Sequence, residues 1–536
     1  MIKISAGTCA QGRAERLGRL RTCLAAALVG TVLTTGIGAG AASANPRPTP
    51  TPAVPSPTVS GPTTGGTHGY PYWSTTLDLA THRYVEEEYF FRGTARSLVP
   101  VQPLDGITDG RWDSTPTGAT ADYDVRMLVR RPQHPAKFNG KVIVEWMNVT
   151  EGWEIDPIWT LASDELIRSG YAYVGVGAQR TGTSFLQTWD SSRYGGLNHP
   201  GDSFSYDIFS QAGMAIAHPR RGAIAPLGNL TPKVRALLAG GQSQSGGRMI
   251  TYINAAHPTA NVYDGFLVVS SSRGAGLSQA PQPAIGTPGG AQSRIRTDIA
   301  EPVLVYLPET DVPGAATGLH QQPDSDRFRL WEYTGTAHAD RFWFEASAPT
   351  RVKAGVSGPA LESRPYGLLI TTCSPTTPIN EGPSTYATRA AVDAIGEWSI
   401  KRNRAPAIGD RISLTIPTTG AASVDRDPAT GIAIGGIRLP QITVPTETLR
   451  GQGSSAGGFC TLFGLSDRWN RDTDPFDGQV IDNPAPSPEP DVRSLYGSPH
   501  RYVARVHVAA NHAASDRLLL RADIAAVVNT ARQVRF

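Results

Sequence analysis

The sequence of 536 residues is poor in long apolar runs, in net charge and in metal-binding or phosphate-binding motifs, and each absence excludes a class of protein. No apolar run outside the N-terminal 44 residues approaches the ~20 residues that a membrane-spanning helix needs. The formal charge is only +3 and charged residues make up 18% of the sequence, so no basic face for nucleic acid is indicated. No His and Cys residues have metal-site spacing and no glycine loop suits phosphate, so we expect no metal and no cofactor. These shortages are typical of a soluble globular protein without stable membrane insertion.

Residues 1–44 have the three parts of a secretory signal peptide. A basic stretch is followed by an apolar, small-residue run over 24–41 and by small residues at 42–44. No paired arginines precede the run, which favours the general secretory (Sec) route over the twin-arginine route. We expect cleavage after Ala44 and a secreted or cell-envelope location in a bacterium, with an N-terminal membrane anchor as the alternative. Removing this leader takes away five basic residues and one acidic residue, which leaves a formal charge of −1.

Cysteine is also scarce, with four in the whole sequence. Two of them fall in the leader, so only Cys373 and Cys460 remain in the mature chain. Two cysteines in an exported protein form one candidate disulfide, worth ~4–5 kcal/mol because the loop it closes is long. Two unpaired buried thiols are the alternative.

Proline and glycine, in contrast, are plentiful, with 43 and 57 residues. Residues 45–69 are mostly Pro, Thr, Ser and Gly with scarcely a large apolar residue, so we expect an extended linker there. The body over 70–536 is expected to form one domain, with an irregular insertion or subdomain at about 350–470.

Strands and helices alternate along this body. This alternation predicts an α/β fold with a mostly parallel central sheet covered by helices on both faces. The expected strands are 121–131, 141–146, 171–176, 234–239, 265–269, 302–307 and 328–333. The expected helices are 159–169, 205–218, 248–256, 383–401 and 518–531.

The candidate nucleophile follows the strand at 234–239, where the chain reads LLAGGQSQSGGRMI. A serine on a sharp strand-to-helix turn needs small residues two positions before and after it, and Gly241 and Ser245 provide them for Ser243. Ser245 fits the same frame, with Gly247 as a flank. We favour Ser243 because the apolar strand ends just before Gly241.

Two later strands end in residues that complete this chemistry. Asp311 follows the strand at 302–307, and His338 lies in a small-residue loop after the strand at 328–333. The order Ser243, Asp311, His338 is that of a serine hydrolase triad, in which the carboxylate orients the histidine and the histidine activates the serine. Glu309 is the alternative acid.

The tetrahedral intermediate of such a reaction needs two hydrogen-bond donors for its oxyanion. One is expected to be the backbone N–H of Gln244, directly after the nucleophile. The second is expected from the loop at 147–152, with Asn148 or Val149 favoured because they are close to the strand end.

The body resembles the α/β-hydrolases, and more closely the bacterial group described as alpha/beta hydrolase domain proteins. The similar blocks are GQSQSGGRMITYINAAHP (241–258), PVLVYLPETDV (302–312), EYTGTAHAD (332–340), CSPTTPINEGP (373–383) and GGIRLPQITVP (435–445). The resemblance implies a serine hydrolase fold and ester hydrolysis.

The function favoured by these patterns is a secreted carboxyl-ester hydrolase that forms an acyl-enzyme. Its substrate is expected to be a small-molecule or lipid ester, and no nucleic-acid partner is expected. Four tryptophans near the strand ends could line the pocket for this substrate or pack in the core; they are Trp146, Trp153, Trp159 and Trp189. An acyltransferase using the same triad is the first alternative, and a non-catalytic binding protein with a hydrolase fold is the second. The sequence does not indicate an oligomeric state.

Overall fold

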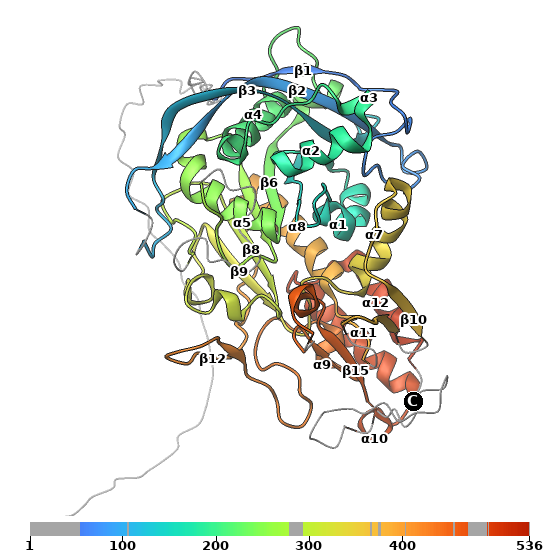
Figure 1. The fold of residues 1–536 in the computed structure, drawn as a ribbon. Helices are drawn as coiled ribbons and strands as arrows, with labels where there is room; N and C mark the ends of the chain where they lie inside the picture. Colours follow the sequence, from blue (N-terminus) through green and yellow to red (C-terminus); the bar gives the residue numbers. More distant parts are fainter. Residues whose placement is uncertain are drawn as a thin grey trace, which may run out of the picture. The chain divides into compact units, whose positions relative to one another are not determined.

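A nine-stranded sheet organises the protein, whose computed structural model describes residues 54–103, 107–277, 293–364, 367–373, 377–402, 404–453, 456–469, 490 and 492–534. The strand order is β1-β2-β3-β5-β4-β6-β7-β8-β9. Neighbours from β5 to β9 are parallel, whereas β1, β2, β3 and β5 pair antiparallel (Figure 1). The strands are β1 Thr58–Ser60, β2 Tyr84–Pro100, β3 Ser114–Pro132, β4 Lys141–Trp146, β5 Ala172–Val176, β6 Ala236–Gln242, β7 Gly265–Val269, β8 Val303–Pro308 and β9 Phe328–Tyr333.

The parallel strands are buried on both faces because successive side chains point to opposite sides of a strand. In β8, for example, Val303 and Val305 enter one hydrophobic core, whereas Leu304 and Tyr306 enter the other. This is why the strand reads as an uninterrupted apolar run in the sequence. The predicted mostly parallel sheet is confirmed.

Helices cover both faces of the sheet. Residues of α4 and α5 share the first core with the sheet, and residues of α1, α8, α11 and α12 share the second. A single π-helical turn, Tyr252–Ala256, joins α5 to α6. The helices are α1 Pro157–Arg168, α2 Arg180–Trp189, α3 Ser191–Tyr194, α4 Ser205–Ala217, α5 Gln244–Thr251, α6 His257–Ala260, α7 Arg341–Ala354, α8 Ser384–Ile400, α9 Pro440–Thr443, α10 Val492–Tyr496, α11 Pro499–Ser515 and α12 Ile524–Ala531.

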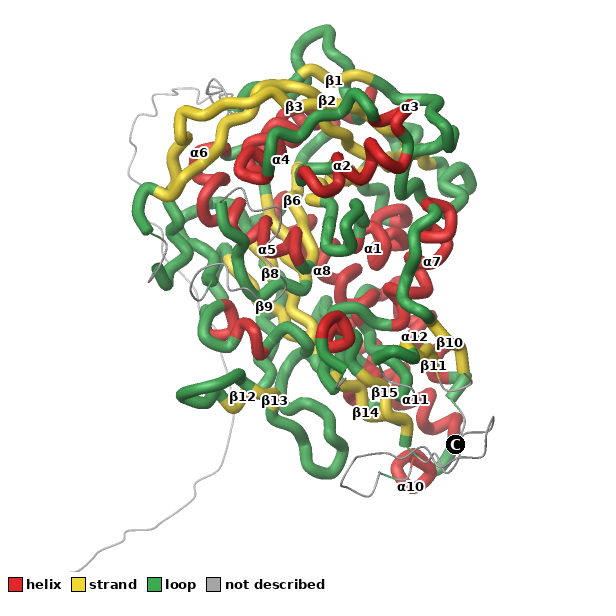
Figure 2. Tube along the Cα trace, in the orientation of Figure 1, coloured by secondary structure: helices red, strands yellow, loops and turns green. Residues whose placement is uncertain are grey.

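The part of the chain after β9 adds small antiparallel hairpins to this framework (Figure 2). They are β10–β11 (Leu361–Arg364 and Gly367–Ile370), β12–β13 (Leu414–Thr415 and Ser423–Val424) and β14–β15 (Glu447–Arg450 and Leu465–Arg468). The segment predicted to be irregular over about 350–470 therefore contains ordered hairpins, and α8 runs through it.

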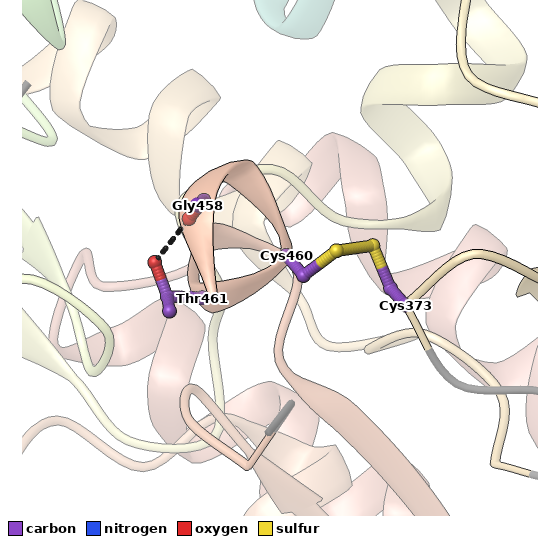
Figure 3. Close-up of a disulfide and its surroundings, with 4 residues drawn as sticks. All are labelled: Cys373, Gly458, Cys460 and Thr461. Atoms are coloured by element: carbon purple, nitrogen blue, oxygen red, sulfur yellow. Dashed lines mark hydrogen bonds between the residues drawn. A yellow bond between two sulfur atoms is a disulfide. The ribbon is translucent and has the colours of Figure 1, made fainter. Parts of the chain in front are cut away.

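A disulfide links two segments of this region. Cys373, just after β11, is bonded to Cys460 in the 3-10 helix Gly458–Leu462 (Figure 3). Within that short helix, the hydroxyl of Thr461 donates a hydrogen bond to the carbonyl of Gly458 over 2.8 Å. The structure therefore has the predicted cysteine pairing.

The N-terminal boundary of the body differs from the prediction. The expected signal peptide at 1–44 and the first part of the expected linker lie outside the described residues, but residues 54–69 pack on the body. Val54 and Val59 are buried, and β1 pairs with β2. The guanidinium of Arg193 fixes the segment by donating hydrogen bonds to the carbonyls of Thr63 and Gly65, at 2.8 and 2.6 Å. The body therefore starts well before residue 70.

The C-terminal end also differs. The predicted helix over 518–531 is confirmed only from Ile524, and it follows a longer helix, α11, that the apolar pattern did not indicate. The hydroxyl of Tyr333, at the end of β9, donates to the carbonyl of Leu518, so this end of the chain is fixed to the sheet.

Candidate active site

Ser243 lies on a tight turn between β6 and α5. Its backbone has φ 58° and ψ −120°, which is rare for a residue with a side chain. A Cβ atom at Gly241 would lie 2.5 Å from the backbone oxygen of Ser245, so only glycine fits there. The turn therefore requires the small residue that the sequence places two positions before the serine.

His338 and Asp311 meet this serine from the ends of two neighbouring strands. The Nε2 atom of His338, in the loop after β9, is 2.8 Å from the hydroxyl oxygen of Ser243. Its Nδ1 atom is 2.9 Å from both carboxylate oxygens of Asp311, which follows β8. The structure thus brings the three residues together in one hydrogen-bonded chain.

Ser245, the alternative nucleophile, lies elsewhere in the turn. Its buried hydroxyl donates to the carbonyl of Gln242 over 2.9 Å and accepts from the backbone N–H of the same residue over 3.1 Å. Both interactions close the turn from inside. The hydroxyl of Ser245 is therefore occupied in holding the backbone that presents Ser243.

Glu309, the alternative acid, is also occupied by backbone groups. Its fully buried carboxylate accepts hydrogen bonds from the N–H groups of Gly335 and Gly451, at 2.8 and 2.9 Å, and pairs with Arg426 at 2.7 Å. These contacts connect the β8 end, the β9 end and the hairpin region after them. The structure places Glu309 as an anchor for the loops beside His338, not as its partner.

Further contacts from the C-terminal region hold the same two loops. The hydroxyl of Thr310 accepts a hydrogen bond from the N–H of His338 over 3.1 Å and donates to the carbonyl of Gly451. The side-chain amide of Asn380 donates to the carbonyls of Gly335 and Arg450, at 3.1 and 2.9 Å. The part of the chain after His338 therefore fixes the position of His338 and of the acid loop.

The residues predicted as oxyanion donors differ in whether their backbone N–H groups are engaged. Gln244 is the first residue of α5, and its N–H has no helical carbonyl four residues before it. The N–H of Asn148 donates to the carbonyl of Ile155 over 3.0 Å, so this backbone donor is engaged, and its side-chain amide donates to the carbonyl of Gln242. The N–H of Val149 points at the side-chain oxygen of Gln244, 3.5 Å away. Of the two predicted residues in this loop, Val149 is the one whose N–H faces the turn.

Two buried arginines of β3 hold the loop that carries Asn148 and Val149. Arg126 pairs with Glu154 at 2.7 Å, and Arg130 pairs with Asp156, the residue that precedes α1. Burial raises the pKa of Glu154, and Arg126 opposes this effect by favouring the carboxylate. A buried charge without its partner is costly, so these pairs fix the path of the loop.

The side chains of Ser243 and His338 line a cavity of about 400 Å³. Its walls come from the loop before α1, from α7 and from the 3-10 helix that carries Cys460, and they are mainly aromatic and aliphatic. Of the four tryptophans considered from the sequence, only Trp153 lines it, whereas Trp146 is the last residue of β4 and its buried ring packs on Phe209. Trp343 and other lining residues of α7 were not foreseen, because that helix was not predicted.

A sequence model of the alpha/beta hydrolase domain family matches residues 59–529. The chain belongs to this family. None of the curated proteins compared with this alpha/beta hydrolase is similar enough in sequence to count as a match.

Several solved esterase structures resemble this alpha/beta hydrolase over about half of its length. Methylesterase BT1017 is 13% identical, with a TM-score of 0.25, and the match covers 48% of this chain and 47% of the methylesterase. Brefeldin A esterase, described as a bacterial homologue of human hormone-sensitive lipase, is 12% identical with a TM-score of 0.27, covering 53% of this chain and 80% of that one. A CE15 glucuronoyl esterase from Teredinibacter turnerae is 12% identical with a TM-score of 0.24, covering 52% and 75%. Because these values are low, the assignment rests on the family match.

The described residues of this alpha/beta hydrolase lack two features. In the described part of the chain, no three His, Cys, Asp or Glu residues are grouped so that they could bind a metal ion. None of the helices in that part combines the length and the apolar character that crossing a bilayer requires.

Proposed function

We propose that this alpha/beta hydrolase is a serine esterase that cleaves its substrate through an acyl-enzyme. The observation that carries the proposal is the hydrogen-bonded chain from Ser243 through His338 to Asp311 at the mouth of an apolar cavity. A serine, a histidine and a carboxylate in this order and at these distances have the roles of nucleophile, base and orienting acid.

In the first half of the reaction, the hydroxyl oxygen of Ser243 attacks the ester carbonyl carbon while its proton passes to Nε2 of His338. Asp311 accepts a hydrogen bond from Nδ1, which fixes the ring and stabilises its positive charge. The oxyanion is stabilised by the N–H of Gln244 and, after a small shift of the Gln244 side chain, by the N–H of Val149. The carbon–oxygen bond then breaks, and His338 gives its proton to the departing alcohol.

In the second half, water replaces the alcohol. His338 takes a proton from the water as its oxygen attacks the acyl carbon, and returns the proton to Ser243 when the acid leaves. The products are one carboxylic acid and one alcohol. An alcohol acceptor in place of water would give a new ester, so the acyltransferase alternative differs only in the acceptor.

Turnover of p-nitrophenyl esters by two matched serine variants tests this proposal. We expect Ser243→Ala to lose at least about 10³-fold in kcat, because the nucleophile is gone. Ser245→Ala should keep kcat within about tenfold and lose stability instead, because its hydroxyl only closes the turn. Full activity of Ser243→Ala would overturn the proposal. Adding alcohol acceptors tests the alternative, since ester product that exceeds free acid would indicate an acyltransferase.

We also propose that the protein is exported. The leader pattern over 1–44 supports this, and so does the disulfide between Cys373 and Cys460, since such bonds persist mainly outside the cytosol. N-terminal sequencing of the protein recovered from the culture medium or cell envelope should begin at Asn45. An intact N-terminus in the cytosolic fraction would argue against export.

A further inference from the structure

The active-site cavity follows helix α7 away from His338. Trp343 and Phe344 line it in the first turn of the helix, which begins at Arg341, and Arg351 lines it ten residues beyond that start. Ten residues of α-helix span about 15 Å. The cavity therefore runs beside α7 from its first turn almost to its C-terminal end.

Apolar side chains form much of the walls opposite and beside α7. Trp153 and Ile155 come from the loop before α1, and Leu161 comes from the helix itself. Phe459 and Leu462 come from the 3-10 helix that the disulfide fastens. Apolar walls and a volume of about 400 Å³ are typical of a site that takes one hydrophobic ligand group.

An ion pair lines the cavity at the far end of this helix. The guanidinium of Arg351 makes two parallel hydrogen bonds with the carboxylate of Glu151, both 2.6 Å long, and its Nε donates to Ser347. The guanidinium also lies near the rings of Trp73 and Trp343, at 5.7 and 5.8 Å from their centroids. Only 6% of the Arg351 side chain is exposed, against 27% for Glu151.

The two charges of this pair cancel, and each would be uncompensated without the other. A substrate with a second carboxylate would have to displace Glu151 from the bidentate contact, or bring a third charge beside a pair already satisfied. A neutral apolar group has neither cost. The pair therefore selects substrates by charge.

We propose that the cavity binds one apolar aryl or medium-length alkyl group of a neutral ester, and that the Glu151–Arg351 pair in its wall excludes esters carrying a second carboxylate. The inference rests on the proposed esterase function and adds its substrate class. The apolar group belongs to the acyl part or to the alcohol part of the ester, and the assay below separates the two.

Two ester series measure the length of the site with the full mature chain. In one, the alcohol is p-nitrophenol and the acyl chain grows; in the other, the acyl group is acetate and the alkyl alcohol grows. In the series that enters the cavity, kcat/KM should rise by up to about fourfold per buried methylene and then level off. Phe459→Ala, which removes an apolar wall, should reduce this gain most for the longer members. If kcat/KM does not change with chain length in either series, the proposal is overturned.

A matched pair of variants tests the charge selection. For each enzyme, kcat/KM is measured for a neutral p-nitrophenyl ester and for a p-nitrophenyl monoester of a dicarboxylic acid of similar length. We expect Glu151→Gln to change the ratio at least tenfold in favour of the anionic ester, because Arg351 loses its partner. The double variant Glu151→Gln with Arg351→Met should lose that gain, since its cavity holds no charge at this end. An unchanged ratio in Glu151→Gln would overturn the role of the pair.

A control separates the failure of this inference from the failure of the proposed function. A small fluorophosphonate reacts with an activated serine without filling the cavity, so its labelling rate reports the triad alone. Normal labelling together with no dependence on chain length or charge would reject only the substrate class. No labelling and no turnover of any ester would reject the esterase proposal itself.

Discussion

Glu309 and Asp311 lie two residues apart in one loop, yet they make different contacts, and a pair of substitutions separates the roles that we propose for them. Glu309→Gln removes the charge that pairs with Arg426 and leaves one carbonyl oxygen for the two N–H groups of Gly335 and Gly451. Removing one partner of a buried ion pair lowers the free energy of unfolding by about 3–5 kcal/mol, and the Glu309 carboxylate is fully buried. We therefore expect a large loss of stability.

Asp311→Asn should behave in the opposite way. Its carboxylate contacts Nδ1 of His338 through both oxygens and is partly exposed, so an amide of the same shape fits with little loss of stability. The amide does not hold the imidazole in the tautomer that accepts the serine proton. On the proposed mechanism, kcat should fall about 10⁴-fold.

Urea unfolding and ester turnover, measured on the same two preparations, check this pair. Turnover is assayed well below the unfolding midpoint, so that Glu309→Gln is compared in its folded form. These roles are wrong if the free energy of unfolding of Glu309→Gln lies within about 1 kcal/mol of the wild-type value, or if the kcat of Asp311→Asn stays within tenfold of wild type. A large kcat loss in Glu309→Gln alone would mean that this residue, not Asp311, is the acid.

Three further predictions concern the framework of the site. Replacing Cys373 and Cys460 by serine should lower the free energy of unfolding by about 4–5 kcal/mol, because the bond closes a loop with a sequence separation of 87; urea unfolding with and without reductant checks this, and equal midpoints would contradict it. Burial raises the pKa of Asp340 to about 7, so its ionisation costs stability as the pH rises from about 4 to above 7, and Asp340→Asn should gain in melting temperature over wild type across that range. A constant difference across the range would argue against this. Gly241→Val should abolish soluble folded protein or turnover, since even a Cβ there lies 2.5 Å from the Ser245 backbone oxygen; wild-type activity in this variant would contradict the turn geometry.

The central strands and the turn after β6 could be predicted because their causes are local. Strands buried on both faces read as short apolar runs, as at Lys141–Trp146 and Phe328–Tyr333, where the predicted and observed bounds agree. The tight turn at Ser243 could be predicted from its small neighbours, and these are required by the backbone conformation of the turn itself. Asp311 and His338 followed because parallel strands bring their carboxyl ends to one edge of a sheet.

The cavity could not be predicted because its walls are brought together only by the fold. Helix α7 has charged and small residues among its apolar ones and Pro349 in its interior, which obscures its period in the sequence. The ion pair joins Glu151 to Arg351 across 200 residues. Neither residue stands out from its neighbours in the chain.

The packing of residues 54–69 on the body could not be predicted for a similar reason. Its composition is that of a linker, with few large apolar residues to bury. It is held instead by backbone carbonyls that accept hydrogen bonds from Arg193, and by the short pairing of β1 with β2. Such contacts depend on partners far along the chain and leave no pattern in the segment itself.

The central claim, that Ser243 is the nucleophile, is tested most directly by locating the covalent adduct. Wild type, Ser243→Ala and Ser245→Ala are treated with a fluorophosphonate, digested and mapped by mass spectrometry. We expect an adduct on Ser243 in wild type and in Ser245→Ala, and no adduct in Ser243→Ala. An adduct on Ser245, or equal labelling of Ser243→Ala, would contradict it.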